Sequence, residues 1–171
     1  KAYDAGGGLL YESGTYDEAE GRLVQDPQAK VYEVKQGMTP ELVADLNREP
    51  GESLHFVLNN TVVKDNRIPP RGYLVERFDQ DGLRPVGTHF VDQQHWDDTQ
   101  YELPLETEYV IVTLYYQSAS REYVEFLHKL GGVDGQALEA LWAQSKGDPV
   151  PMARVIEPAN RVYVPVVQKG H

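Results

Sequence analysis

The chain has 171 residues, a net charge of −11, 40% hydrophobic residues and no cysteine. This length and hydrophobic content predict a folded globule, and the negative charge disfavours polyanionic partners such as nucleic acid. Without cysteine the chain cannot form disulfides, zinc–thiolate sites or the covalent haem attachment of Cys-x-x-Cys-His motifs. No apolar run in the sequence is long enough to span a bilayer, so we expect no membrane insertion.

The first segment, KAYDAGGGLLY, begins without Met and contains three consecutive glycines, Gly6–Gly8. Glycine-rich segments often act as flexible linkers. We therefore expect residues 1–8 to be a linker from an upstream region of a longer protein. Residues 9–171 are expected to form a single domain.

Short alternating or apolar runs, separated by Gly, Pro, Asp and Asn, predict strands along most of the chain. In chain order these runs are Lys30–Lys35, Ser53–Asn59, Tyr73–Phe78, Glu108–Tyr116, Ala153–Glu157 and Arg161–Gln168. The run Glu108–Tyr116 is apolar on both faces, which is typical of a central strand. Pro165 marks the last run as an edge strand, because proline cannot donate a ladder hydrogen bond.

Helical spacing and capping residues predict helices over Thr39–Asn47, Ser120–Gly132 and Asp134–Gly147. Thr39 is the N-cap candidate of the first helix and Ser120 or Ser118 that of the second, and glycine ends the second and third segments. Strands outnumber helices and do not alternate regularly with them. The sequence therefore predicts a mostly β fold, an antiparallel, jelly-roll-like β-sandwich with two or three short peripheral helices.

The polar stretch KDNRIPPRGY, residues 64–73, follows a predicted strand. Its Asp and Asn side chains can bond nearby backbone amides, its prolines stiffen the chain, and its glycine permits unusual backbone angles. The pattern predicts a rigid loop that braces its own domain or contacts a neighbouring one. The residues assigned to this interdomain or structural loop are Asn59, Asn60, Lys64, Asp65, Asn66, Arg67, Pro69, Pro70 and Gly72.

The motifs HFVLNN, KDNRIPPRGY, LYYQ and EYVEFL occur in this order along the chain. Together with the segments Val112–Leu127 and Ala137–Ala153, they resemble a β-rich domain at the C-terminal end of bacterial multihaem c-type cytochromes and related secreted proteins. The resemblance implies a noncatalytic module, periplasmic or at the cell surface, that supports or docks an upstream haem-bearing domain of the same electron-transfer protein. It implies no cofactor within this segment, with haem in the neighbouring domain, and it supplies no catalytic residues.

Acidic residues near glycine offer oxygen ligands for Ca²⁺, and the first-choice candidates are Asp79, Asp81, Asp92, Asp97 and Asp98. Acidic loops with glycine are also common hairpin turns, which is the simpler interpretation. His89 and His95 lie close by in sequence. Imidazole and carboxylate groups together can hold a transition metal, although this spacing matches no named motif.

The competing hypothesis is a calcium- or carbohydrate-binding β-sandwich module that binds its ligand with loops at one end. An enzyme with a carboxylate site is a third hypothesis. We expect no enzyme, because Ser118 and Ser120 lie in no nucleophile elbow and the glycine run at 6–8 lacks the lysine of a phosphate loop. The sequence leaves the oligomeric state and the redox partner open.

Overall fold

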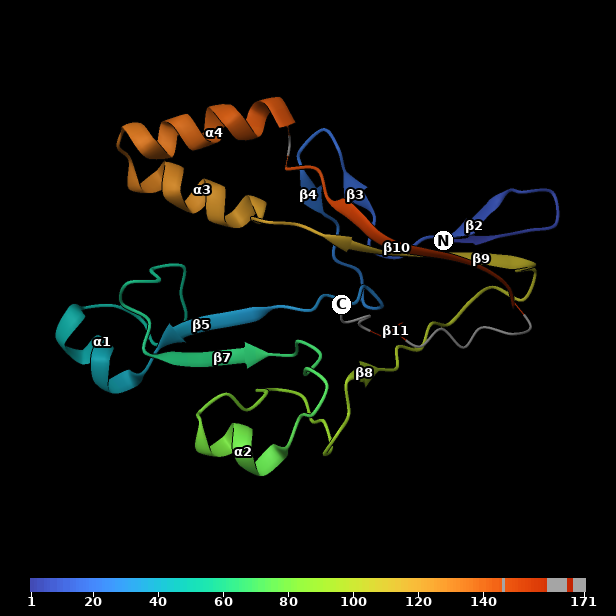
Figure 1. The fold of residues 1–171 in the computed structure, drawn as a ribbon. Coiled ribbons are helices and arrows are strands. Elements are labelled where there is room, and N and C mark those ends of the chain that lie inside the picture. The colour runs from blue at the N-terminus through green and yellow to red at the C-terminus, as the bar shows by residue number, and fades with distance from the viewer. Residues whose placement is uncertain (146, 160–165, 168–171) are drawn as a thin grey trace. The chain divides into compact units, whose positions relative to one another are not determined.

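A computed structural model describes residues 1–145, 147–159 and 166–167. The chain divides into two compact units, whose elements are labelled in Figure 1. Unit 1 comprises Lys1–Lys30 and Gln100–Tyr163, and unit 2 comprises Val31–Thr99 and Val164–His171. Residues 9–171, expected to form one domain, contribute to both units. Among the described helices, none has both the length and the apolar character needed to cross a membrane.

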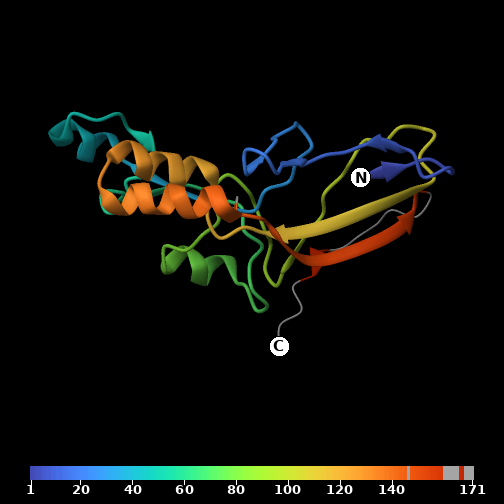
Figure 2. The same ribbon diagram turned by 90° about the horizontal axis from the view of Figure 1, so that it is seen from above.

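Unit 1 is built on a four-stranded antiparallel sheet in the order β10 (Val150–Pro158), β9 (Tyr109–Tyr116), β1 (Ala2–Tyr3) and β2 (Leu9–Tyr11). Figure 2 shows β9 and β10 running side by side along their length. The strand β9 confirms the prediction of a central strand, because it pairs on both sides.

The first eight residues differ from the expected linker. Ala2 is fully buried and pairs with Val110 of β9, so β1 is an integral strand of the sheet. The glycines form the turn between β1 and β2, where the carboxylate of Asp4 accepts hydrogen bonds from the amides of Gly6 and Gly8, each at 2.8 Å. The linker expectation is wrong because it used composition alone, whereas glycine also serves tight hairpins.

A helical hairpin and a short β-hairpin complete unit 1. The helices α3 (Arg121–Leu130) and α4 (Val133–Ser145) lie side by side in both views (Figures 1 and 2). The β-hairpin joins β3 (Tyr16–Asp17) to β4 (Arg22–Leu23). The predicted Ser120 cap is confirmed, since its hydroxyl accepts a hydrogen bond from the Tyr123 amide at 3.3 Å. Val124 and Trp142 are the buried apolar side chains of the helix pair.

Unit 2 contains a three-stranded antiparallel sheet in the order β6 (Gly51–Glu52), β5 (Val34–Met38) and β7 (Thr61–Asp65). A second ladder pairs β8 (Trp96–Asp97) with β11 (Val166–Val167). The helices are α1 (Pro40–Leu46), which confirms the first predicted helix, and α2 (Val75–Gln80). The buried apolar side chains of this unit are Met38, Val43, Tyr73 and Phe90.

Two predicted strands of unit 2 are wrong. Residues 53–59 form turns, because the Ser53 hydroxyl accepts a hydrogen bond from the His55 amide and the Asn59 side chain donates to the Ser53 carbonyl. The run Tyr73–Phe78 is mostly α2. The carboxylate of Asp92 accepts a hydrogen bond from the first helical amide, that of Val75, at 2.8 Å, and this distant cap is invisible to a local pattern.

Of the remaining strand predictions, one has different bounds in the structure and one is confirmed. The expected run 30–35 becomes β5, which begins at Val34. The run Ala153–Glu157 lies within β10. Of the run 161–168, only β11 belongs to the described residues, so the expectation for Pro165 lies outside them.

The described residues thus form antiparallel sheets and four helices, with about 26% strand and 23% helix overall and no closed barrel. Antiparallel pairing agrees with the predicted fold class. The helical share is larger than predicted, because α2 replaces a predicted strand and α4 is 13 residues long.

Candidate functional site

The loop of residues 64–73 in unit 2 is internally braced. The carboxylate of Asp65 accepts hydrogen bonds from Nη2 and Nε of Arg67 at 2.6 and 2.9 Å. This guanidinium lowers the pKa of Asp65 below its ordinary value. The backbone of Asp65 also exchanges both its hydrogen bonds with Val86, at 2.9 and 3.0 Å. Asp65, near the start of the loop, is therefore bonded both to another loop residue and to the chain segment after α2.

Asn66 joins the same loop to the segment before β5. Its Oδ1 accepts a hydrogen bond from the Glu33 amide at 2.8 Å, and its Nδ2 donates to the Val31 carbonyl at 2.8 Å. Pro69 is buried, and Tyr73 at the end of the loop is only 1% exposed. Gly72 has φ of 83°, which favours glycine there. Pro70 is exposed.

The remaining predicted loop residues also make contacts within unit 2. Asn60 accepts a hydrogen bond from the Thr39 amide at 3.0 Å and so holds the start of α1. Lys64 pairs with the Glu33 carboxylate at 2.7 Å. Asn59 donates through Nδ2 to the Ser53 carbonyl at 2.8 Å, while its Oδ1 is buried without a hydrogen-bond partner among the described residues.

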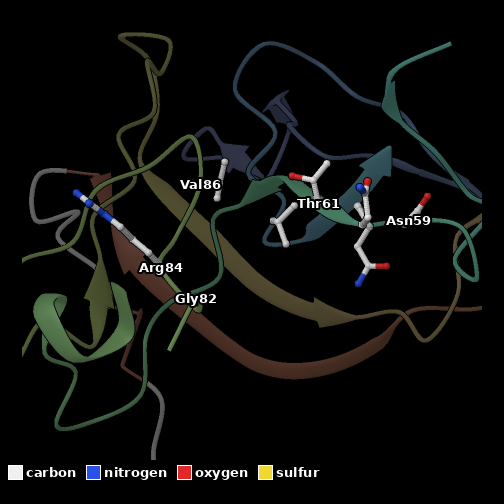
Figure 3. A pocket seen from close by; sticks show the side chains of 8 residues that line it. Asn59, Thr61, Gly82, Arg84 and Val86 are labelled. Atoms are coloured by element: carbon white, nitrogen blue, oxygen red, sulfur yellow. The ribbon is translucent and has the colours of Figure 1, made fainter. Parts of the chain in front are cut away.

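An open hollow of about 560 Å³ lies in unit 2 (Figure 3), and one of its lining residues, Val86, exchanges backbone hydrogen bonds with Asp65 of this loop. It is lined by Gln36, Asn59, Asn60, Thr61, Val62, Gly82, Arg84 and Val86, all from unit 2. Figure 3 shows Thr61 and Asn59 close together. Arg84 is the only charged residue of the lining, and it pairs loosely with Asp79 at 3.5 Å. Amide and hydroxyl groups both donate and accept hydrogen bonds, so this lining suits an uncharged polar surface.

Asp79, Asp81, Asp92 and Asp97, four of the five predicted metal ligands, each have a structural role in unit 2. Asp79 pairs with Arg84, Asp92 caps α2, and Asp97 accepts a hydrogen bond from the Tyr32 hydroxyl at 3.1 Å. Asp81 is the C-cap of α2 and shares a second hollow, of about 490 Å³, with Asp92.

Glu76 and Arg77 line this second hollow as well, so it contains a cation beside the carboxylates. The Asp98 side chain is exposed. Within the described ranges, no group of three or more His, Asp or Glu residues could hold a metal ion.

The two predicted histidines lie on the surface of unit 2. His89 is exposed, and Nδ1 of His95 lies 3.0 Å from the Gln93 carbonyl. The His95 ring meets Trp96 edge-on, with 5.3 Å between ring centroids. His95 is therefore oriented by these two contacts.

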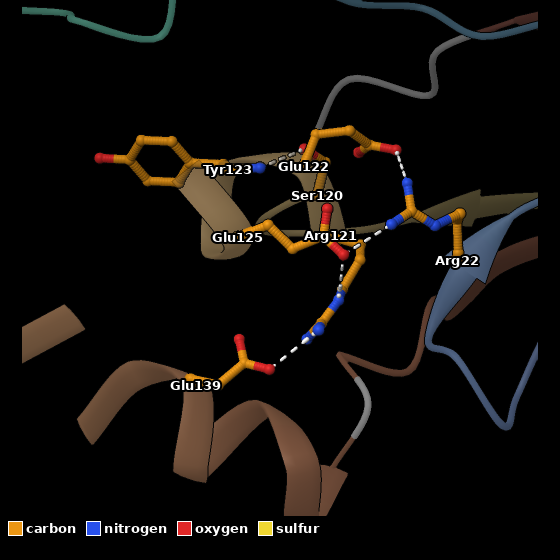
Figure 4. A network of polar contacts seen from close by, with 7 residues as sticks. All are labelled: Arg22, Ser120, Arg121, Glu122, Tyr123, Glu125 and Glu139. Atoms are coloured by element: carbon orange, nitrogen blue, oxygen red, sulfur yellow. Dashed lines mark hydrogen bonds and ion pairs between the residues drawn. The ribbon is translucent and has the colours of Figure 1, made fainter. Parts of the chain in front are cut away.

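Sequence reasoning missed a polar network in unit 1, shown in Figure 4. Arg22 of β4 pairs with Glu122 and Glu125 of α3 at 2.9 and 2.8 Å. Arg121 pairs with Glu125 at 3.1 Å and with Glu139 of α4 at 2.8 Å. The two guanidinium groups, Arg22 first, lower the pKa of Glu125 below its ordinary value. Only the Arg121–Glu125 spacing of four residues was visible in the sequence.

Sequence reasoning also missed Gln36, Thr61 and Arg84 as neighbours of Asn59. These residues come from three separate segments, and no local motif joins them. Comparisons with family models, with curated proteins and with solved structures found no match to the chain.

Proposed function

We propose that the chain is a noncatalytic extracytoplasmic module of a larger, multihaem cytochrome-like electron-transfer protein. It would support or dock the upstream haem-bearing domain of the same protein, in the periplasm or at the cell surface. The proposal is carried by one observation: the loop of residues 64–73 is braced beside an open polar hollow. No haem is assigned to this segment.

The bracing supports a docking role because binding is stronger when a surface is already ordered. An ordered loop loses little conformational entropy when a partner binds. The side chains of Asn66 and Asp65 form their hydrogen bonds within unit 2, so they hold the loop in place. We therefore take the hollow beside the loop as the contact surface. The same residues belong to the motif on which the resemblance depends.

The chemistry of the hollow defines the partner surface. Gln36 and Thr61 supply amide and hydroxyl groups that suit main-chain and uncharged polar groups of a neighbouring domain. The net charge of −11 favours a partner with a basic face, since complementary charge steers association. The expected complex between domains is small and polar, as is typical of electron-transfer contacts.

The proposal includes a jelly-roll-like antiparallel β-sandwich as the architecture. It is supported by antiparallel pairing in both units and by a buried side on each sheet, represented by Val110 in unit 1 and Met38 in unit 2. An experimental structure of the chain tests this directly. Two sheets that do not face each other would contradict the sandwich.

The parent gene gives the first test of the function. We expect its reading frame to encode Cys-x-x-Cys-His motifs upstream of Lys1. A parent frame without any such motif would refute the electron-transfer assignment.

A binding experiment gives the second test. The upstream haem-bearing domain is titrated with the present chain, and binding is followed by calorimetry. Thr61→Arg should weaken binding by placing a long charged side chain at the hollow, whereas Thr15→Arg, at an exposed position of unit 1, is the control and should leave binding unchanged. Equal binding by all three forms would show that the hollow is not the docking surface.

Carbohydrate binding is a second candidate function, favoured by the same amide- and hydroxyl-rich lining. Sugar hydroxyls need both donors and acceptors, which Gln36 and Thr61 provide. Affinity electrophoresis in gels containing neutral polysaccharides tests this candidate. Retardation that Gln36→Ala abolishes would support it, and unchanged mobility in every polysaccharide would exclude it.

A further inference from the structure

The strand β10 forms an open edge of the unit 1 sheet. It pairs with β9 on one side, and no other described strand pairs with it. Seven of its nine residues are exposed, and they include Val150, Met152 and Ile156, each about 60% exposed. Edge strands of this length are usually shortened, charged or covered, because their free amides and carbonyls attract further strands. Within β10 this protection consists of two prolines, Pro151 and Pro158, and of the charged residues Arg154 and Glu157, so the run 153–157 between the prolines keeps all its amides.

The hydrogen bonds of β9 show which backbone groups of β10 point outward. Ile111 donates to the Lys1 carbonyl at 2.8 Å and accepts from the Lys1 backbone nitrogen at 3.0 Å, so its backbone faces β1. Alternate residues of an antiparallel strand face opposite neighbours. Val110 and Val112 therefore face β10.

The partners of these residues in β10 follow from the register. Glu157 pairs with Val110 and Val155 pairs with Val112, so their backbones bond to β9. Arg154 and Ile156, which lie between and beside them, direct their N–H and C=O groups away from the sheet. These four groups form the free hydrogen-bonding row of the edge.

We propose that β10 pairs with β10 of a second copy of this chain, antiparallel about a twofold axis through Val155. In this register Arg154 of one copy faces Ile156 of the other, and the two pairs form four main-chain hydrogen bonds. The valines at the axis face each other, and Ala153 faces Glu157. No like charges lie opposite each other. The inference goes beyond the proposed function and does not depend on it.

Other twofold registers are less favourable. An axis through Arg154 places two guanidinium groups opposite each other, which destabilises a cross-strand pair. An axis through Ile156 places Pro158 opposite Arg154, and proline has no N–H for the Arg154 carbonyl. Of these three axes the strand complements itself best about Val155, and this self-complementarity points to a second copy as the occupant.

The size of the contact predicts a weak dimer. Pairing along one strand belongs to the class of interfaces below about 1,200 Å² in total, which is typical of weak complexes. Each copy carries a net charge of −11, so the copies repel each other at low salt. Dimerisation should therefore increase with protein concentration and with salt.

Sedimentation velocity over a range of about 5 to 500 µM tests the dimer. Arg154→Pro should raise the dissociation constant at least about tenfold, because each copy loses one outward N–H and the dimer loses two hydrogen bonds. Arg154→Ala is the matched control, since it removes the charge and keeps the backbone N–H. The dimer should survive in this control.

A second variant guards against misfolding of the proline form. Ile156→Lys changes only a side chain that is 58% exposed, and it places Lys opposite Arg154 of the other copy. It should also raise the dissociation constant about tenfold. A chain that stays monomeric over the whole range at high salt would overturn the proposal. So would a dimer that neither variant weakens.

Amide hydrogen exchange gives the most direct readout. On raising the concentration, the amides of Arg154 and Ile156 should gain protection, because they become bonded only in the dimer. The amide of Val155 already bonds to β9 and should change little. Equal protection gains at all three residues, or none at Arg154 and Ile156, would contradict the proposed pairing.

Discussion

The replacement Asn66→Asp tests whether the loop of residues 64–73 is braced as the structure indicates. Asn66 is half-buried, accepts a hydrogen bond from the Glu33 amide and donates one to the Val31 carbonyl. Asp has the same shape, keeps the acceptor and loses the donor. Its carboxylate oxygen then faces the Val31 carbonyl oxygen, so one bond is lost and one carbonyl is left unpaired.

The expected cost is about 2 kcal/mol at pH 7, which is typical of a lost bond with an unsatisfied partner. For a chain of this size such a cost lowers the thermal midpoint by about 4–8 °C. The facing carbonyl also raises the pKa of the new carboxyl above its unfolded value of about 3.9. Because the folded-state pKa is raised, the penalty is present at neutral pH and shrinks as the pH falls toward the unfolded value.

Tryptophan fluorescence reports on the correct unit. Trp96 lies in unit 2 and Trp142 in unit 1, so a Trp142→Phe background leaves Trp96 as the sole reporter. Urea unfolding of the parent chain and of Asn66→Asp is compared at pH 7 and at about pH 3.5. The control is Gln100→Glu, which adds the same charge at an exposed position. A penalty that is absent at pH 7, or equal at both pH values, would refute the bracing role.

Four further predictions concern the loop, the helix hairpin, the ion-pair network and calcium. Arg67→Ala should lower the unfolding free energy by up to about 1 kcal/mol, because it removes the partly exposed ion pair with Asp65. An unchanged urea midpoint would contradict a bracing role. Gly135→Ala should destabilise unit 1, since a Cβ there would clash with the Leu127 carbonyl of the facing helix; circular dichroism melting measures this loss, and Ala137→Gly is the comparison for helix propensity alone. Arg22 and Arg121 lower the pKa of Glu125, so the stabilising effect of the ionised carboxylate is present above the unfolded-state pKa and is lost as the pH falls through the folded-state pKa. Glu125→Gln should therefore reduce stability at pH 7 and make little difference near pH 3. Melting midpoints measured across an acid pH series check this. If the acidic residues near α2 bind Ca²⁺, millimolar Ca²⁺ should raise the melting midpoint and a chelator should reverse the rise, whereas identical melting curves would remove calcium from the proposal.

The sequence predicted those elements whose signals are local. The structure confirms both the Thr39–Asn47 and the Ser120–Gly132 helices. The Ser120 hydroxyl caps its helix as predicted, whereas the Thr39 side chain makes no cap hydrogen bond. The strand β9 is apolar on both faces and is the central strand of its sheet. The rigid loop was also recognised, because Asp, Asn, Pro and Gly have specific turn conformations.

One error, the strand expected over residues 53–59, arose from local side-chain bonds that the alternating pattern did not reveal. Two others occurred where distant residues decide the conformation. The run Tyr73–Phe78 has a strand-like pattern, but Asp92 caps it as a helix from 17 residues away. Gly6–Gly8 has the composition of a linker, but the pairing of Ala2 with Val110 makes it a hairpin turn. In both of these cases the deciding contact joins residues that no short sequence window contains together.

By itself the sequence determined the charge, the absence of covalent haem attachment, the Ser120 helix cap and the antiparallel character of the sheets, because each of these could be predicted from residue type or from neighbours along the chain. Only the tertiary structure decided which residues share a surface. It placed Gln36, Thr61 and Arg84 around one hollow and linked Arg22 to α3, since such contacts join segments far apart in the chain. It also left β10 at the sheet edge, because strand order depends on which strands pair across the whole chain and not on the pattern of any one of them.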